Sequence, residues 1–103
     1  MSRVIYVAGK YRDKSKSGIC KNIEHARREA VKLWQAGWVV ICPHCNSALF
    51  DRCPDDVFLK GGLELVRRSD AIFMLSNWKE SKGAVTEYAL ALALNKGIYY
   101  EEE

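Results

Sequence analysis

The sequence predicts an α/β domain in which helices cover both faces of a parallel sheet. Short, continuous apolar segments recur along the 103-residue chain, and segments with helical spacing separate them. Strands that are buried on both faces carry such continuous apolar runs. The alternating order, β-α-β-α-β-α-β, favours right-handed crossovers between parallel strands. We therefore expect a small Rossmann-like or flavodoxin-like three-layer domain with a four-stranded parallel sheet in the order 2-1-3-4.

Four segments have the composition of buried strands, which is rich in β-branched, aromatic and aliphatic side chains. They are residues 3–8, 38–42, 71–75 and 98–100. Gly9 and Pro43 follow the first two strands, and both residue types are typical of chain turns. The segments 10–18 and 43–54 are polar, and we expect both to be loops.

Three segments are predicted to be helical: residues 19–36, 54–69 and 83–96. The first places apolar side chains at spacings of three and four and is followed by Gly37, a common helix stop. The second begins at Pro54, ahead of two aspartates, which suits a helix start. Gly61 and Gly62 interrupt it, at roughly 1 kcal/mol each relative to alanine. Trp34 and Leu92 are expected in the core, although the apolar surface of these helices also suits a partner subunit.

The composition indicates a single globular domain over residues 1–103. Hydrophobic residues make up 49% of the chain and charged residues 28%, which is ordinary for a folded protein. No apolar run approaches the ~18 residues that span a membrane, and the N-terminus lacks a signal-peptide core. We expect a cytoplasmic protein with no membrane contact.

The charge is unevenly distributed along the chain. Residues 1–35 carry nine basic and three acidic side chains, whereas residues 36–103 carry seven and ten. The basic half suggests an anionic ligand, but the net charge of +3 is too small to indicate nucleic acid. A solvated helix face is the simpler interpretation of the basic residues within 19–36.

Four cysteines, Cys20, Cys42, Cys45 and Cys53, are expected to be reduced thiols in the cytosol. Cys42 and Cys45 have the C-x-x-C spacing of many zinc sites, but no second pair is present to complete four ligands. The sequence therefore predicts no metal and no cofactor. A zinc-stabilised interaction or nucleic-acid domain is a weaker alternative.

Ligands of doubly wound sheets bind at the carboxyl ends of the strands, which selects the segments 9–13, 43–51 and 76–83. The basic side chains of these segments suit a phosphate, and their polar side chains suit a sugar or a base. The tryptophan suits a stacked base, and the helix start suits an anion. The candidate substrate-binding residues are Gly9, Lys10, Arg12, His44, Asn46, Asp51, Trp78, Ser81 and Gly83. Neither a G-x-G-x-x-G fingerprint nor a Walker loop is present.

Glu87 is an isolated acid in the apolar third helix, close to the ligand end of the sheet. Pattern alone leaves two interpretations open, a solvent-facing side chain and a functional carboxylate.

Three segments together resemble the nucleoside 2-deoxyribosyltransferase superfamily. They are Ile5-Tyr6-Val7-Ala8-Gly9, residues 69–75 followed by Trp78, and the S-x-G-x-x-x-E pattern from Ser81 to Glu87. The superfamily includes deoxynucleoside 5′-monophosphate N-hydrolases and small phage and bacterial relatives, and the resemblance covers nearly the whole chain. It implies cleavage or transfer at the N-glycosidic bond of a nucleoside or nucleoside 5′-monophosphate.

The resemblance also implies roles. Glu87 would be the nucleophile, Tyr6 would position it, and Gly9, Ser81 and Gly83 would lie at the sugar and phosphate end. A carboxylate suits this chemistry, because glycosidic cleavage passes through an oxocarbenium-like state. The resemblance further implies homodimers or higher oligomers with sites near an interface.

One position departs from the family pattern. Gly62 stands where relatives carry an acid that handles the leaving base or orients the sugar. Two consequences are open: slow turnover, with Asp51, Asp56 or His44 as a substitute, or a widened pocket in a module that only binds nucleotides. The second gives the alternative function, a catalytically weak or inactive nucleotide-binding sensor.

Overall fold

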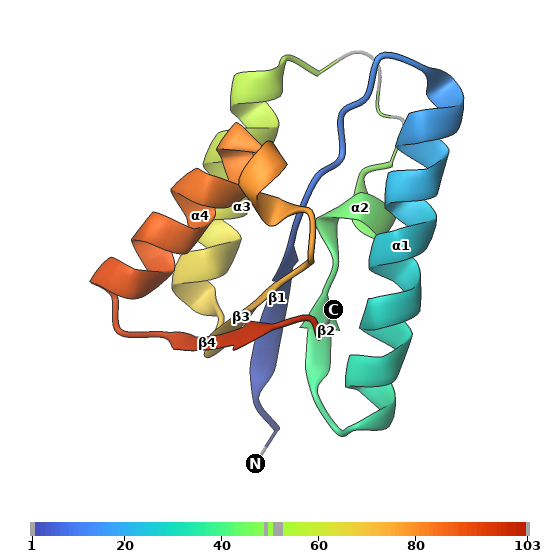
Figure 1. The fold of residues 1–103 in the computed structure, drawn as a ribbon. Helices are drawn as coiled ribbons and strands as arrows, with labels where there is room; N and C mark the ends of the chain where they lie inside the picture. Colours follow the sequence, from blue (N-terminus) through green and yellow to red (C-terminus); the bar gives the residue numbers. More distant parts are fainter. Residues whose placement is uncertain (1, 49, 51–52, 103) are drawn as a thin grey trace.

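A parallel sheet of four strands forms the centre of the protein, as the sequence predicts. The computed structural model describes residues 2–48, 50 and 53–102 (Figure 1). The strands are β1 (Val4–Ala8), β2 (Val39–Ile41), β3 (Ala71–Met74) and β4 (Gly97–Tyr100). Their order is β2-β1-β3-β4, and every neighbouring pair is parallel. The predicted α/β class and strand order are therefore confirmed.

Helices cover both faces of this sheet, which gives three layers. The helical segments are α1 (Lys16–Gln35), α2 (Pro43–Asn46), α3 (Asp55–Arg68), the 3₁₀ turn η1 (Trp78–Glu80) and α4 (Lys82–Ala93). Figure 1 shows α1 and α2 on one side of the sheet and α3 and α4 on the other. No helix in the described part of the chain is long and apolar enough to cross a membrane.

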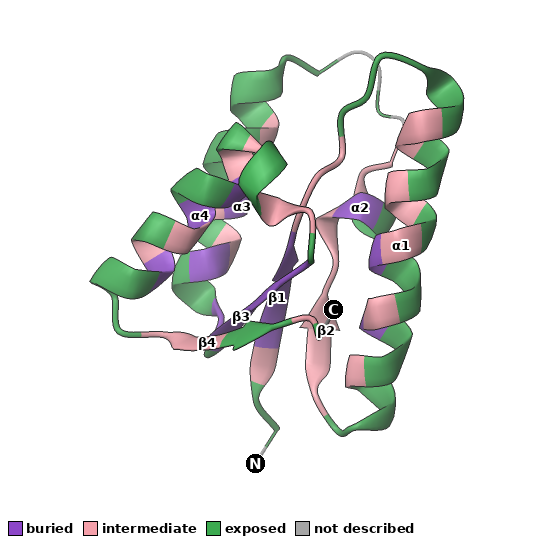
Figure 2. Cartoon of the chain, viewed as in Figure 1, coloured by how far each residue is buried: buried purple, intermediate pink, exposed green. Residues whose placement is uncertain are grey.

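The alternation of side chains along β1 divides the core into two clusters. Ile5 and Val7 point toward α1 and pack with Ala26, whereas Tyr6 and Ala8 point toward α3 and α4. Helices cover both clusters, so β1 and β3 are buried on both faces (Figure 2). Strands in this position carry continuous apolar runs. Tyr6 is thereby directed into the layer that contains Glu87.

Serine caps set the starts of two helices. Ser15 accepts a hydrogen bond from the backbone N–H of Gly18, so α1 begins at Lys16 rather than at residue 19. Ser81 accepts one from Ala84 at 3.1 Å and begins α4 one residue earlier than predicted. The predicted extension of this helix to residue 96 is wrong, because Asn95 adopts φ 56° and ends the helical path.

Three further expectations are corrected. The predicted loop 43–54 contains the short helix α2, which Pro43 starts. Trp34 is 54% exposed and Leu92 is 49% exposed, so neither belongs to the core. The preceding residue in each helix, Leu33 or Ala91, packs against the core instead. Because one step along a helix rotates a side chain by about 100°, the next residue points away from the sheet.

Candidate functional site

A buried pair of side chains, Tyr6 and Glu87, lies between β1 and α4. The Tyr6 hydroxyl donates a hydrogen bond of 2.6 Å to Oε2 of Glu87. Tyr6 is 2% exposed and Glu87 is 9% exposed. The interpretation of Glu87 as a solvent-facing residue is therefore wrong.

Burial changes the acidity of both members of this pair. Desolvation raises the pKa of Glu87 to about 7, and the hydrogen bond from Tyr6 opposes that rise. The pKa of Tyr6 is raised by its own burial and by the neighbouring Glu87 carboxylate. Tyr6 therefore remains a hydrogen-bond donor at neutral pH, while Glu87 exchanges its proton near neutrality. Such a carboxyl group is a candidate for chemistry.

Gly62 of α3 lies directly against the Tyr6–Glu87 pair. A Cβ atom at this position would lie 2.5 Å from Oε2 of Glu87 and 2.8 Å from the Tyr6 hydroxyl. The space that a side chain would need is therefore filled by the pair itself. The hypothesis that Gly62 widens the pocket is wrong, because its missing side chain makes room for the Glu87 carboxylate.

The loop after β1 is held against the loop after β3. The backbone N–H of Lys10 donates to Oδ1 of Asn77 at 3.0 Å. A Cβ on Gly9 would lie 2.5 Å from Cδ1 of Leu75, so only glycine allows this close approach. Lys10 also extends its ammonium group to Glu80 at 3.2 Å. Gly9 and Lys10 thus lie at the carboxyl edge of the sheet, as predicted.

His44 is buried on α2 and supports the same loop. Its Nε2 lies 3.0 Å from the carbonyl oxygen of Lys10. Burial lowers the pKa of His44, which favours a neutral ring that donates from Nε2 to this carbonyl. Its Nδ1 is buried without a hydrogen-bond partner in the described structure. His44 therefore holds the backbone of the β1 loop.

The remaining predicted binding residues are more dispersed. Arg12 pairs with Asp55, and both side chains are well exposed. Asn46 is exposed at the end of α2. Trp78 packs against Tyr88 with ring centroids 4.6 Å apart and the ring planes tilted by 35°. Asp51 lies outside the described residues.

Ser81 and Gly83 lie at the start of α4, one turn before Glu87. The Ser81 hydroxyl caps the helix through Ala84 and thereby fixes the position of its first turn. Both residues are half-buried. The helix start and the carboxylate therefore belong to one rigid element.

A chain of polar contacts links residues that are not among the predicted site residues. Glu101 accepts the Ser76 N–H at 2.8 Å and lies 2.8 Å from Nε2 of His25. The other ring nitrogen of His25 lies 3.4 Å from the Asn77 amide. Asn77 lies three residues after the end of β3, at the carboxyl edge of the sheet, and that position was its only signal in the sequence.

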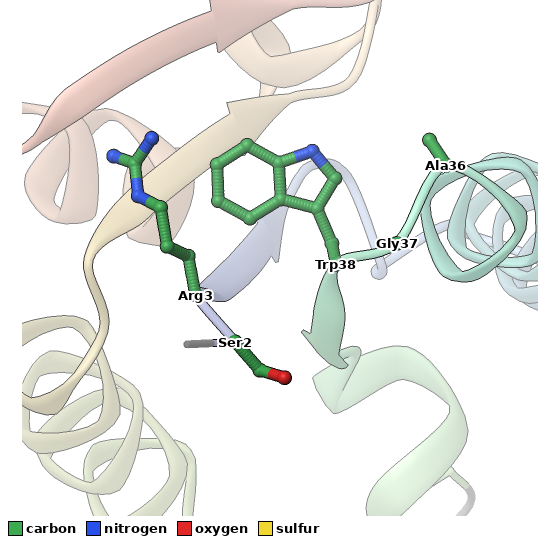
Figure 3. Close-up of a pocket in the computed structure, with 5 residues that line it drawn as sticks. All are labelled: Ser2, Arg3, Ala36, Gly37 and Trp38. Atoms are coloured by element: carbon green, nitrogen blue, oxygen red, sulfur yellow. The ribbon is translucent and has the colours of Figure 1, made fainter.

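Two hollows on the surface of the described residues are lined by residues other than Tyr6 and Glu87. One, of about 310 Å³, is lined by Ser2, Arg3, Ala36, Gly37 and Trp38 (Figure 3). It lies at the amino ends of β1 and β2, opposite the edge where ligands of such sheets bind. Arg3 stands 5.0 Å from the Trp38 ring there. The chemistry of the buried carboxylate, rather than the size of this hollow, defines the candidate site.

No metal centre is formed by the described residues, among which no group of three or more His, Cys, Asp or Glu side chains could hold an ion. Cys42 and Cys45 lie close together, but neither Cys20 nor Cys53 joins them in such a group.

The sheet order and the helices on both faces define an α/β protein with a four-stranded parallel sheet. The chain is similar in structure to a 2-desoxiribosyltransferase from Leishmania mexicana, with a TM-score of 0.65 and 19% identity. The alignment covers 95% of this chain and 63% of that protein, so the chain spans less than two thirds of its length. At this identity the similarity shows a shared fold.

The chain belongs to the family described as Domain of unknown function (DUF4406), whose family model matches residues 3–100. No curated protein matches the chain in sequence. The resemblance to the deoxyribosyltransferase superfamily is thus confirmed for the fold.

Proposed function

We propose that the protein cleaves or transfers the N-glycosidic bond of a nucleoside or nucleoside 5′-monophosphate, with Glu87 as the nucleophile. The observation that carries this proposal is the buried Glu87 carboxylate, hydrogen-bonded at 2.6 Å to Tyr6. The relation in fold to a 2-desoxiribosyltransferase supports the substrate class. The proposed catalytic domain comprises residues 1–103.

In the proposed reaction, ionised Glu87 attacks C1′ of the sugar from the face opposite the base. The bond from C1′ to the base nitrogen breaks, and its electron pair leaves with the base, which is protonated from solvent. The resulting glycosyl ester is hydrolysed by water or attacked by a second base. Tyr6 is a positioning residue that orients one carboxylate oxygen and leaves Oε1 for the sugar.

The phosphate end of the ligand is assigned to the loop after β1 and the start of α4. Lys10 and Arg12 supply positive charge there, and Ser81 and Gly83 supply a hydroxyl and backbone N–H groups. Lys10 pairs with Glu80, and Arg12 pairs with Asp55. A 5′-phosphate would have to replace these exposed pairs, each of which contributes only about 0–1 kcal/mol.

A second copy of the chain is proposed as the partner. Large apolar side chains remain exposed on the helices and on the edge strand β4, including Trp34, Val85, Leu92, Leu94 and Tyr100. A domain of this size gains burial by association, and a neighbouring copy could close a site built from short loops.

The proposal is tested by incubating the protein with a panel of nucleosides and nucleoside 5′-monophosphates and separating the free base by chromatography. Base release is expected from at least one deoxynucleotide and should be lost in Glu87→Ala. Glu64→Ala, which removes an exposed glutamate of α3 that pairs with Arg68, is the matched control and should retain activity. An intact panel after hours of incubation would refute the proposal.

A nucleotide-binding module without turnover is the second candidate. Two observations favour it: Gly62 provides no second carboxylate, and the pKa of Glu87 near 7 leaves a share of the protein without an ionised nucleophile at neutral pH. Calorimetry distinguishes the two, because a binding module takes up nucleotide without releasing base. Absence of binding to every nucleotide of the panel would exclude this candidate.

A further inference from the structure

Two cysteines, Cys42 and Cys45, face each other at the junction of β2 and α2. Cys42 follows the last residue of β2, and Pro43 starts the short helix that carries Cys45. The thiol of Cys42 donates to Sγ of Cys45 at 3.5 Å. A disulfide needs about 2.05 Å between the sulfurs, so a small side-chain movement would suffice.

The two thiols differ in their access to solvent. Cys45 is exposed, whereas Cys42 is half-buried at the end of the strand. Burial, together with the neighbouring Cys45, raises the pKa of the Cys42 thiol to about 12. Cys45 is therefore the thiol that an external reagent meets first, and Cys42 is placed behind it.

We propose that Cys42 and Cys45 form a redox-active dithiol that exchanges with small-molecule disulfides of the glutathione class. The C-x-x-C spacing beside a strand-helix-strand unit is typical of such pairs. This site is independent of the glycosidic chemistry assigned to Glu87.

The exchange takes place in two balanced steps. The Cys45 thiolate attacks one sulfur of the external disulfide, forming a mixed disulfide and releasing one thiol. Cys42 then loses its proton to solvent and attacks Sγ of Cys45, which breaks the mixed disulfide and releases the second thiol. In sum, the protein dithiol is oxidised to one intramolecular disulfide, and the small disulfide is reduced to two thiols.

The proposed disulfide would lie on the α1 side of the sheet, opposite the layer that contains the Tyr6–Glu87 pair. Ile41, which precedes Cys42, is the register partner of Tyr6 in the sheet. His44, enclosed between the two cysteines, holds the carbonyl of Lys10 at 3.0 Å. The modification would thus close a short ring around the residue that supports the β1 loop.

The test uses the full chain with Cys20→Ser and Cys53→Ser, which leaves only the two thiols of interest. This variant is reduced, freed of reductant and incubated with oxidised glutathione, and intact mass is recorded after acid quenching. The expected main product has the mass of a single chain less two hydrogens and carries no alkylatable thiol. Thermal unfolding of the reduced protein checks that both serines are tolerated.

A second variant with Cys42→Ser in the same background isolates the first step. It should accumulate a stable adduct of one glutathione on Cys45, which added dithiothreitol removes. Cys45→Ser should react at least tenfold more slowly, because Cys42 is half-buried. The proposal is overturned if the two-thiol protein gives only a persistent glutathione adduct or only disulfide-linked dimers. It is also overturned if the two-thiol protein still has both thiols free at the time when the Cys42→Ser variant has fully reacted.

Discussion

The hydroxyl of Tyr6 lies 2.6 Å from Oε2 of Glu87, although 81 positions separate the two residues in the chain. The contact joins the central strand β1 to helix α4, and Gly62 of α3 closes it from a third side. A carboxyl group in this position is desolvated and anchored by one oxygen. Both the proposed nucleophile and its acidity therefore depend on three distant segments.

The pH dependence of base release should follow the ionisation of Glu87. Its pKa of about 7 lies above the ordinary value of 4.5, because burial disfavours the charged form. Since only the ionised carboxylate is a nucleophile, kcat should rise roughly tenfold per pH unit below 7 and level off above it. A stopped chromatographic assay between pH 5 and 9 measures this. A profile that is already flat at pH 5 would contradict the raised pKa.

Tyr6→Phe should move that profile toward higher pH. The hydrogen bond from Tyr6 lowers the pKa of Glu87, and a hydrogen bond to a charged group contributes about 1.5–3 kcal/mol. Its loss corresponds to an upward shift of roughly one to two pH units in the activity profile. Tyr99→Phe, on the exposed edge strand, is the control and should leave the profile in place. A lower kcat with an unmoved profile would mean that Tyr6 does not act through the Glu87 ionisation.

Glu87→Gln should stabilise the protein at alkaline pH. The folded-state pKa is raised, so the folded protein binds the Glu87 proton more tightly than the unfolded chain does between pH 4.5 and about 7. The free energy of unfolding contributed by this group is present below that window and is lost as the pH rises through it. The free energy of unfolding of the variant, minus that of the native protein, should therefore be larger at pH 8 than at pH 4 by on the order of 3 kcal/mol.

Urea unfolding of both proteins at the two pH values gives this difference. All other titrating groups are common to both proteins and largely cancel in the comparison. An equal difference at pH 4 and pH 8 would show that Glu87 ionises in the folded protein as it does in the unfolded chain.

The two adjacent glycines of α3 should respond differently to alanine. Nothing lies within 4 Å of a Cβ placed on Gly61, so Gly61→Ala should raise the free energy of unfolding by about 0.5–1 kcal/mol without altering base release. A Cβ on Gly62 would lie 2.5 Å from Oε2 of Glu87. Gly62→Ala should therefore displace the carboxylate and should not raise the free energy of unfolding as Gly61→Ala does. It should also reduce base release on the order of 10²-fold.

Urea unfolding and the base-release assay separate the two glycine variants, because both make the same chemical change at neighbouring positions of one helix. Equal activity in the two variants would mean that the Glu87 carboxylate is not held against Gly62 during turnover.

Much of the fold follows from local patterns in the sequence. The four strands are continuous apolar runs, and the sheet order follows from right-handed crossovers of short connections. The exact ends of the helices were harder to predict, because serine caps and the left-handed conformation of Asn95 determine them. The burial of Trp34 could not be judged from apolarity, since its neighbour Leu33 competes for the same face of the sheet.

The sequence by itself determined the α/β class and the parallel sheet, and it predicted Glu87 as a candidate functional carboxylate. Only the tertiary structure decided that Glu87 is buried, that Tyr6 anchors it, and that the absent side chain of Gly62 leaves room for its carboxylate. The physical reason is that desolvation and hydrogen-bond geometry depend on packing between β1, α3 and α4. The same reason applies to the 3.5 Å contact of Cys42 and Cys45, which their spacing alone did not determine.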